Sequence, residues 1–166
     1  MPPHPATLDD DRLLAECEFR ATRRGGPGGQ HRNKVETAVI LTHRPTGTSA
    51  EASERRSQEA NRQMALHRLR VRLALEVRTP GEPSLSPLWQ QRTAGGRIAV
   101  NREHRDFPTL LAEALDVIAH RDHQVGEAAA WLGVSTTQLV NLLRKAPEAL
   151  QRLNDERKKR GLGPLR

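Results

Sequence analysis

The alternation of apolar and polar residues near the start of the chain predicts a small antiparallel sheet. Residues 13–22 (LLAECEFRAT) alternate as a β-strand does, with every second side chain on the same face. Residues 36–43 predict a second strand, and residues 48–52 pair back on it through a turn at residues 45–47. We expect the first strand to supply these core residues: Leu14, Cys17, Phe19 and Ala21.

The spacing of apolar residues then changes to that of a helix. No glycine or proline occurs between Gln58 and Arg78, and Ser57 can cap the first turn. Arginines occupy much of the surface that is not apolar. The residues that recur on the apolar face of this predicted helix are Leu66, Leu69, Leu73 and Val77.

A segment typical of a linker follows the long helix. Residues 79–96 concentrate three prolines, three glycines and two serines. Beyond it, Asp106 and Pro108 open a predicted helix that ends at about His120. Its apolar face is formed by Leu110, Leu111, Leu115 and Ile118.

The remaining sequence predicts a helix-turn-helix. Residues 124–132 form its first helix, Gly133 and Val134 turn the chain, and Ser135 caps a helix over residues 136–144. We expect Trp131 and Leu132 to be core residues of this segment. Pro147 starts one more helix, which leads into a short basic tail.

These elements indicate an α+β chain with a small mixed or antiparallel sheet and a long helix, followed by a small all-α segment of helix-turn-helix character. We place the first domain at residues 1–78 and a linker at residues 79–105. A small helical domain with a basic C-terminal tail occupies residues 106–166.

Positive charge is concentrated in the sheet and long-helix region. Residues 1–18 carry one Arg against five acidic residues, whereas residues 19–78 carry thirteen Arg or Lys against five. This excess is typical of a phosphate-binding surface. Aromatic residues are only 2% of the chain, which argues against an RNA-binding sheet that stacks bases on aromatic rings.

The most informative segment is GPGGQHRNK, residues 26–34, because its glycines favour a loop that presents its backbone. It is followed at fixed spacing by TAV (37–39), HRPTG (43–47), RSQ (56–58), Asn61-Arg62 and Ala65. Over roughly 60 residues this set resembles the GGQ catalytic domain of class I peptide-chain release factors, and in particular their codon-independent ribosome-rescue relatives.

The resemblance implies a translation-termination activity: ribosome-dependent hydrolysis of peptidyl-tRNA. The catalytic residues would be Gly28, Gly29 and Gln30, with the main-chain N–H of the glutamine stabilising the developing oxyanion. Gln30 would also be a site of methylation by a glutamine methyltransferase. The residues expected to contact ribosomal RNA are Arg23, Arg24, His31, Arg32, Asn33, Lys34, Arg55 and Arg56.

Further expectations concern the subclass and the partners. About 25 residues precede the loop, too few for a codon-reading domain, so we expect codon-independent rescue of stalled ribosomes. No apolar run reaches the length of a membrane span, the start lacks a signal peptide, and Cys17 is a single cysteine, which predicts a cytoplasmic protein. We expect a monomer that binds the large ribosomal subunit and peptidyl-tRNA, and that uses no cofactor or metal.

The alternative is a non-catalytic protein that binds RNA or DNA through the basic loop and the helix-turn-helix segment. Its recognition helix would begin at Thr136, in the sequence GVSTTQLVNLLRK. Two other chemistries have no support in the sequence. Gly29 is followed by Gln30 rather than by the Lys-Ser/Thr pair of a nucleotide-binding loop, and no serine lies in a nucleophile-elbow context.

Overall fold

The computed structural model describes residues 2–23 and 36–166. The described chain divides into two compact units. The first, which we call the sheet unit, comprises residues 5–73. The second, the helical unit, comprises residues 74–166 together with the first residues up to His4.

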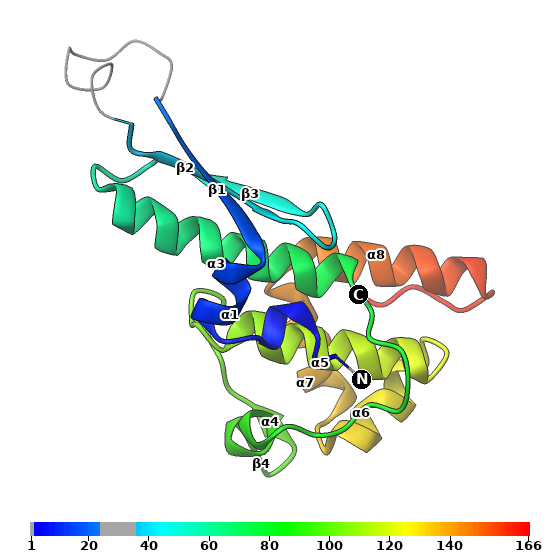
Figure 1. Ribbon diagram of the computed structural model, residues 1–166. Helices are drawn as coiled ribbons and strands as arrows, with labels where there is room; N and C mark the ends of the chain where they lie inside the picture. Colours follow the sequence, from blue (N-terminus) through cyan, green and yellow to red (C-terminus); the bar gives the residue numbers. More distant parts are fainter. Residues whose placement is uncertain (1, 24–35) are drawn as a thin grey trace. The chain divides into compact units, whose positions relative to one another are not determined.

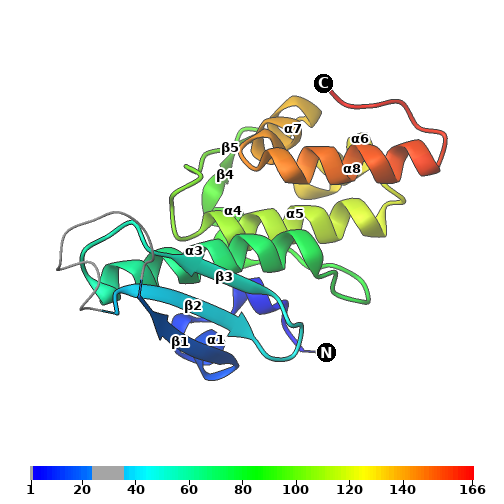
Figure 2. The ribbon, with the colours of Figure 1, turned by 90° about the horizontal axis from the view of Figure 1, so that it is seen from above.

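Three antiparallel strands form the sheet of the sheet unit, in the order β1-β2-β3 (Figures 1 and 2). Their bounds are β1 Cys17–Thr22, β2 Ala38–His43 and β3 Ser49–Ala52. In this register Phe19 lies opposite Leu41, which lies opposite Ala50. The predicted second and third strands are confirmed, and so is the turn between them, where Gly47 adopts φ +72.

The first strand is shorter than predicted, because a helix occupies the start of that segment. α1 spans Asp10–Ala15, after a short 3-10 helix η1 at Pro5–Thr7. The carboxylate of Asp9 accepts a hydrogen bond from the main-chain N–H of Arg12 at 2.9 Å, and so caps α1. Leu13 is consequently the fully buried residue of this segment, whereas Leu14 is only half-buried.

The core predicted from β1 is confirmed only for Cys17, which is buried. Phe19 is 47% exposed and Ala21 half-buried, although both share the face of Cys17. Since β1 is an edge strand, its middle residues have a neighbouring strand on one side only. The other buried apolar residues of the sheet come from β2, where Val39 and Leu41 are fully enclosed, and from β3, where Ala50 and Ala52 are buried.

The long helix is confirmed as α3, Gln58–Glu76, which runs along one face of the sheet (Figures 1 and 2). The Ser57 hydroxyl caps it by accepting the N–H of Ala60 at 3.2 Å. Its apolar face is buried, as expected for an amphipathic helix packed on a sheet. The buried apolar residues of this helix within the sheet unit are Ala65, Leu66, Leu69 and Leu73.

The helical unit is built from α4 to α8 and a two-stranded ribbon, β4-β5. The helix bounds are α4 Pro87–Arg92, α5 Phe107–His120, α6 Val125–Leu132, α7 Thr136–Arg144 and α8 Pro147–Lys159. The predicted helices and the Ser135 cap are confirmed, since the Ser135 hydroxyl accepts the N–H of Gln138 at 3.1 Å. Leu132 is a core residue as predicted, but Trp131 is only half-buried.

Residues 79–105, for which the composition predicts a linker, contain α4 and the ribbon strands β4 (Thr93–Ala94) and β5 (Arg97–Ile98). Trp89 is 1% exposed, and its indole N–H donates to the main-chain oxygen of Leu132 at 2.9 Å. Burial of a large aromatic ring therefore orders a segment rich in proline and glycine.

The basic tail also belongs to the ordered part of the helical unit. The N–H of Leu165 donates to the Asn154 side chain at 2.7 Å, and the Asn154 amide donates back to the Leu165 oxygen at 3.0 Å. The Arg157 guanidinium donates to the oxygen of Gly163 at 2.9 Å. These contacts hold residues 161–166 alongside α8.

Candidate functional site

Strands β1 and β2 bracket the segment that carries the predicted chemistry. Their last paired residues are Thr22 and Ala38, and the Arg23 guanidinium lies 3.9 Å from the carboxylate of Glu36. The remaining predicted residues of this segment lie outside the described residues: Arg24, Gly28, Gly29, Gln30, His31, Arg32, Asn33 and Lys34. Their roles stay predictions.

Asn61, in the first turns of α3, connects the end of this segment to a second one. Its side-chain amide donates to the main-chain oxygen of Thr37 at 2.7 Å and to that of Arg55 at 3.0 Å. Its side-chain oxygen accepts the N–H of Arg55 at 2.9 Å. The Asn61 side chain is fully buried, so its polar groups depend on these three protein partners.

A second side chain of α3 supports the same connection. The Gln58 amide donates to the main-chain oxygen of Glu36 at 2.8 Å. The first turns of α3 thus hold two consecutive carbonyls, those of Glu36 and Thr37, just before β2 begins. The backbone that leads out of residues 24–35 is therefore positioned by the helix as well as by strand pairing.

Arg55 and Arg56, the predicted RNA contacts outside the loop, lie in the turn between β3 and α3. Asn61 holds the main chain of Arg55, while both arginine side chains are exposed. Within the described residues, neither guanidinium forms a hydrogen bond or an ion pair. Asn61 therefore bonds to two segments at once: residues 36–37, which follow the predicted loop, and residues 55–56, which carry two of the predicted RNA contacts.

Asn61 belongs to the set of residues that resembles the release-factor domain, but the sequence analysis assigned it no role, although a signal for one was present. Asn61, Ala65, Leu69 and Leu73 recur every fourth residue and so share one face of α3. A polar side chain on an otherwise apolar face of a helix must find buried hydrogen-bond partners. Its position in the stripe therefore predicts a structural or functional role that composition alone does not suggest.

Several arginines of α3 are used within the fold instead of facing solvent freely. Arg68 donates to the oxygen of Glu51 at 2.8 Å, and Arg72 donates to the oxygen of Ser49. The two arginines are four residues apart on the helix, a rise of about 6 Å, and their two acceptors are two residues apart on the strand, a rise of about 6.6 Å. Because these distances are similar, the arginines reach alternate carbonyls of β3. They cover polar groups of an edge strand that would otherwise be unpaired.

The arginine contacts also perturb a carboxylate. The Arg68 guanidinium lies 2.6 Å from Glu54, and the main-chain N–H of Ser53 donates to the same side chain at 2.9 Å. These hydrogen bonds, that of Arg68 above all, lower the pKa of Glu54 to about 2. Glu54 is thus ionised at neutral pH, and its charge offsets that of Arg68 beside the exposed Arg55.

The HRPTG segment, residues 43–47, forms the turn between β2 and β3 and is anchored to the start of β1. The His43 ring is 2% exposed, with Nε2 2.8 Å from the Glu16 carboxylate and Nδ1 2.7 Å from the Thr46 hydroxyl. Arg44 donates to the main-chain oxygens of Ala15 at 2.5 Å and Cys17 at 2.7 Å. These residues are structural supports of the sheet.

Cys17 is the buried thiol of the sheet unit, and burial raises its pKa. A raised pKa keeps the thiol protonated, so it suits a core residue and not a nucleophile. Across residues 2–23 and 36–166, no group of three His, Cys, Asp or Glu side chains could hold a metal ion.

None of the helices in the described part of the chain is both long and apolar enough to cross a membrane.

Comparison with known proteins assigns the region that contains this site to a protein family. The family model of the RF-1 domain matches residues 13–101, which is more than half of the chain. Peptide chain release factor 1 of Xylella fastidiosa is 31% identical over 137 residues, and peptide chain release factor 1 of Caldicellulosiruptor saccharolyticus is 50% identical over 58 residues. Peptide chain release factor 2 of Paramagnetospirillum magneticum is 38% identical over 87 residues.

These similarities cover different shares of the two chains. The match to the Xylella protein includes 69% of this chain and 38% of that protein. The matches to the Caldicellulosiruptor and Paramagnetospirillum proteins include 35% and 52% of this chain, and 16% and 24% of those proteins. The chain therefore spans well under half the length of the relatives that it matches.

Proposed function

We propose that this chain, which belongs to the RF-1 domain family, hydrolyses the ester bond of peptidyl-tRNA on the large ribosomal subunit. The observation that carries the proposal is the position of GPGGQHRNK, residues 26–34, between strands β1 and β2 of the matched domain. Asn61 and Gln58 hold the backbone where this segment joins β2. The relatives reported above are named peptide chain release factors.

In the proposed reaction, water attacks the carbonyl carbon of the ester that joins the peptide to the terminal ribose of tRNA. The bond from that carbon to the ribose oxygen breaks, and the ribose oxygen takes a proton. Negative charge develops on the carbonyl oxygen, and the main-chain N–H of Gln30 stabilises it. Gly28 and Gly29 have no Cβ, which permits close approach of the backbone to crowded RNA.

We further propose that the positive side chains on either side of the GGQ sequence bind ribosomal RNA. Phosphates are the natural partners of arginine forks, and this binding should weaken as salt rises. The exposed guanidiniums of Arg55 and Arg56 support this assignment. The other proposed contacts are Arg23, Arg24, His31, Arg32, Asn33 and Lys34.

The finer proposal is that release needs no stop codon, so that the protein acts in rescue of stalled ribosomes. Residues 102–166, which follow the matched domain in this chain, belong to the helical unit, and we expect them to help choose the ribosomal state that is bound. We propose that the protein works as a monomer in the cytoplasm and that a glutamine methyltransferase modifies Gln30.

The test is release of labelled peptide from ribosomes that hold peptidyl-tRNA, with a stop codon, a sense codon or no codon in the A site. We expect release in all three complexes. Gly29→Ala should slow it by about 100-fold, as loss of oxyanion stabilisation does in other enzymes. The matched control is Gly126→Ala in α6, where a new Cβ meets nothing within 4 Å.

Gly126→Ala should release peptide at the native rate. Release only at a stop codon would refute the rescue proposal and leave the hydrolase proposal intact. A native protein that binds ribosomes but releases no peptide from any complex would refute the hydrolase proposal and favour a non-catalytic binder.

A further inference from the structure

The helix-turn-helix of the helical unit has no role in the proposed hydrolysis. Gly133, with φ +70, ends α6, and the Ser135 cap begins α7. The apolar side of α7 is buried through Leu139, Val140, Leu142 and Leu143. Residues 135–137 are exposed, so α7 presents three hydroxyl side chains to solvent at its start.

The β4-β5 ribbon lies directly against this part of α7. The N–H of Ser135 donates to the oxygen of Gly96 at 2.9 Å, and the N–H of Ile98 donates to the Gln138 side chain at 3.3 Å. Further along, the Lys145 ammonium donates to the oxygen of Val100. Residues 93–102 and 135–145 therefore form one surface, which we call the ribbon-helix surface; both segments appear together in Figure 2.

The ribbon-helix surface contains basic residues and no acidic residue. Its charged side chains are Arg97, Arg102, Arg144 and Lys145. Arg144 donates to the Asn141 side chain at 2.6 Å and to the oxygen of Arg166, and Lys145 is engaged with Val100. Arg97 is exposed, and no residue in 2–23 or 36–166 forms a hydrogen bond or ion pair with its guanidinium.

We propose that the ribbon-helix surface binds double-helical RNA. An unpaired arginine suits a phosphate, and the hydroxyls of Thr136 and Thr137 with the amide of Asn141 suit ribose 2′-hydroxyls in the wide, shallow minor groove. The choice of RNA rests on the proposed function, which brings the chain to the ribosome. The surface thus supplies a second contact with RNA, separate from the sheet unit.

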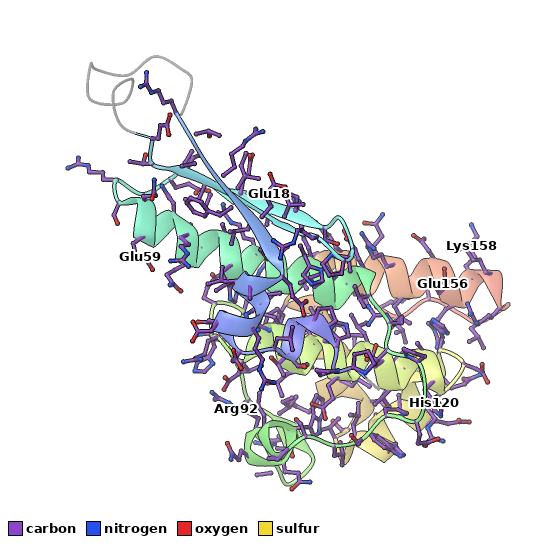
Figure 3. The ribbon with its side chains drawn as sticks, in the orientation of Figure 1. Glu18, Glu59, Arg92, His120, Glu156 and Lys158 are labelled. Atoms are coloured by element: carbon purple, nitrogen blue, oxygen red, sulfur yellow. The ribbon has the colours of Figure 1, made fainter. Side chains whose placement is uncertain are left out.

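The test measures binding of the whole protein to a fluorescent RNA duplex of about 20 base pairs, long enough for a contact of this kind. Anisotropy is recorded over a series of salt concentrations for the native protein, Arg97→Gln and Lys158→Gln. Lys158 is the matched control, because it is an exposed cation of the same unit that lies on α8 (Figure 3). Thermal unfolding followed by circular dichroism shows whether each variant is folded.

Arg97→Gln should weaken binding about fivefold and lower the slope of log K against log salt by about 0.9, the loss of one phosphate contact. Lys158→Gln should bind as the native protein does. Equal effects of the two substitutions would overturn the proposal, because the binding would then reflect net charge alone. Equal affinity for a DNA duplex of the same sequence would overturn the assignment to RNA.

The same proteins separate this proposal from the proposed function. Gly29→Ala should bind the RNA duplex like the native protein while it fails in peptide release. If the native protein released no peptide but duplex binding still depended on Arg97, the hydrolase proposal would fail and the ribbon-helix surface would stand. Normal release together with unchanged binding by Arg97→Gln would overturn the surface alone.

Discussion

The side-chain amide of Asn61 donates a hydrogen bond to the main-chain oxygen of Thr37, with the two atoms 2.7 Å apart. The same side chain makes two more hydrogen bonds to the backbone of Arg55 and is fully buried. Through these bonds α3 holds the place where the chain enters β2 and the turn after β3 that carries Arg55 and Arg56.

Replacing Asn61 by Ala should destabilise the sheet unit by about 3 kcal/mol, since it leaves the N–H of Arg55 and the oxygen of Thr37 without their partners. Urea unfolding followed by circular dichroism measures the change. Gln63→Ala, an exposed amide on the same helix, should change stability by less than about 0.5 kcal/mol. Similar values for both variants would contradict the role of Asn61.

A positioning role predicts a kinetic effect beyond the loss of stability. Asn61→Asp keeps an acceptor for the N–H of Arg55 but loses the donor to Thr37. At temperatures where this variant is folded, the maximal rate of peptide release should fall while ribosome affinity changes little. A loss of affinity with an unchanged maximal rate would show that Asn61 supports binding alone.

Substituting Arg55 and Arg56 together by Gln should weaken ribosome binding and leave the maximal rate of release unchanged, because these side chains lie outside the GGQ sequence. If both contact phosphates, the slope of log K against log salt should fall by about 1.8. Arg20→Gln is the control, an exposed cation on β1 of the same unit. Affinity that stays native in the double variant would remove both residues from the proposed RNA contact.

Substitutions of Trp89 test whether the proline- and glycine-rich segment contributes to the helical unit. Trp89→Phe removes the indole N–H that donates to the main-chain oxygen of Leu132, which should lower the free energy of unfolding by about 1–2 kcal/mol. Trp89→Ala should lower it by about 4 kcal/mol. Chemical unfolding gives both values. Trp131→Phe, at a half-buried ring 5.8 Å from the Arg121 guanidinium, should cost less than about 1 kcal/mol. A Trp89→Ala protein as stable as the native one would show that the segment is a passive connection.

The stability of the helical unit should fall as the solution is made acidic. His4 is buried, and burial lowers its pKa from the ordinary value of 6.5 although the nearby Asp116 favours its protonation. Burial, followed by the charge of Arg160, also lowers the pKa of His123. The unfolded chain then binds protons more readily, so unfolding becomes easier as pH falls from 6.5 toward the lower pKa of each folded-state histidine.

His4→Gln isolates the contribution of His4, because the glutamine amide can still donate to the Val77 oxygen that lies 3.1 Å from Nε2 of His4. The urea midpoint of the native protein should drop between neutral pH and about pH 5, and the drop should be smaller in the variant. The same pH dependence in both proteins would show that His4 does not contribute.

The helices and strands could be predicted where residues close together in the sequence all favoured the same element. The β2-β3 hairpin, α3 and the helices from α5 onward follow from apolar spacing, caps and turn residues that act within a few positions. The predicted first strand is longer than the observed one, because the apolar spacing of residues 13–16 fits either a strand or a helix. Asp9 precedes these residues and favours the helix over the strand, because its side chain caps α1.

From the sequence alone one can predict β2, β3, α3, the helices from α5 onward, the concentration of positive charge in residues 19–78 and the GGQ segment, but not α1, α4 or the β4-β5 ribbon. The tertiary structure alone decided which polar and aromatic groups are buried. It made Asn61 a support, Trp89 a core residue and Phe19 an exposed one. Backbone preferences are set by neighbours in the chain, whereas burial depends on which distant segments pack together. A local pattern therefore predicts an element, but not which of its side chains meet partners from elsewhere in the chain.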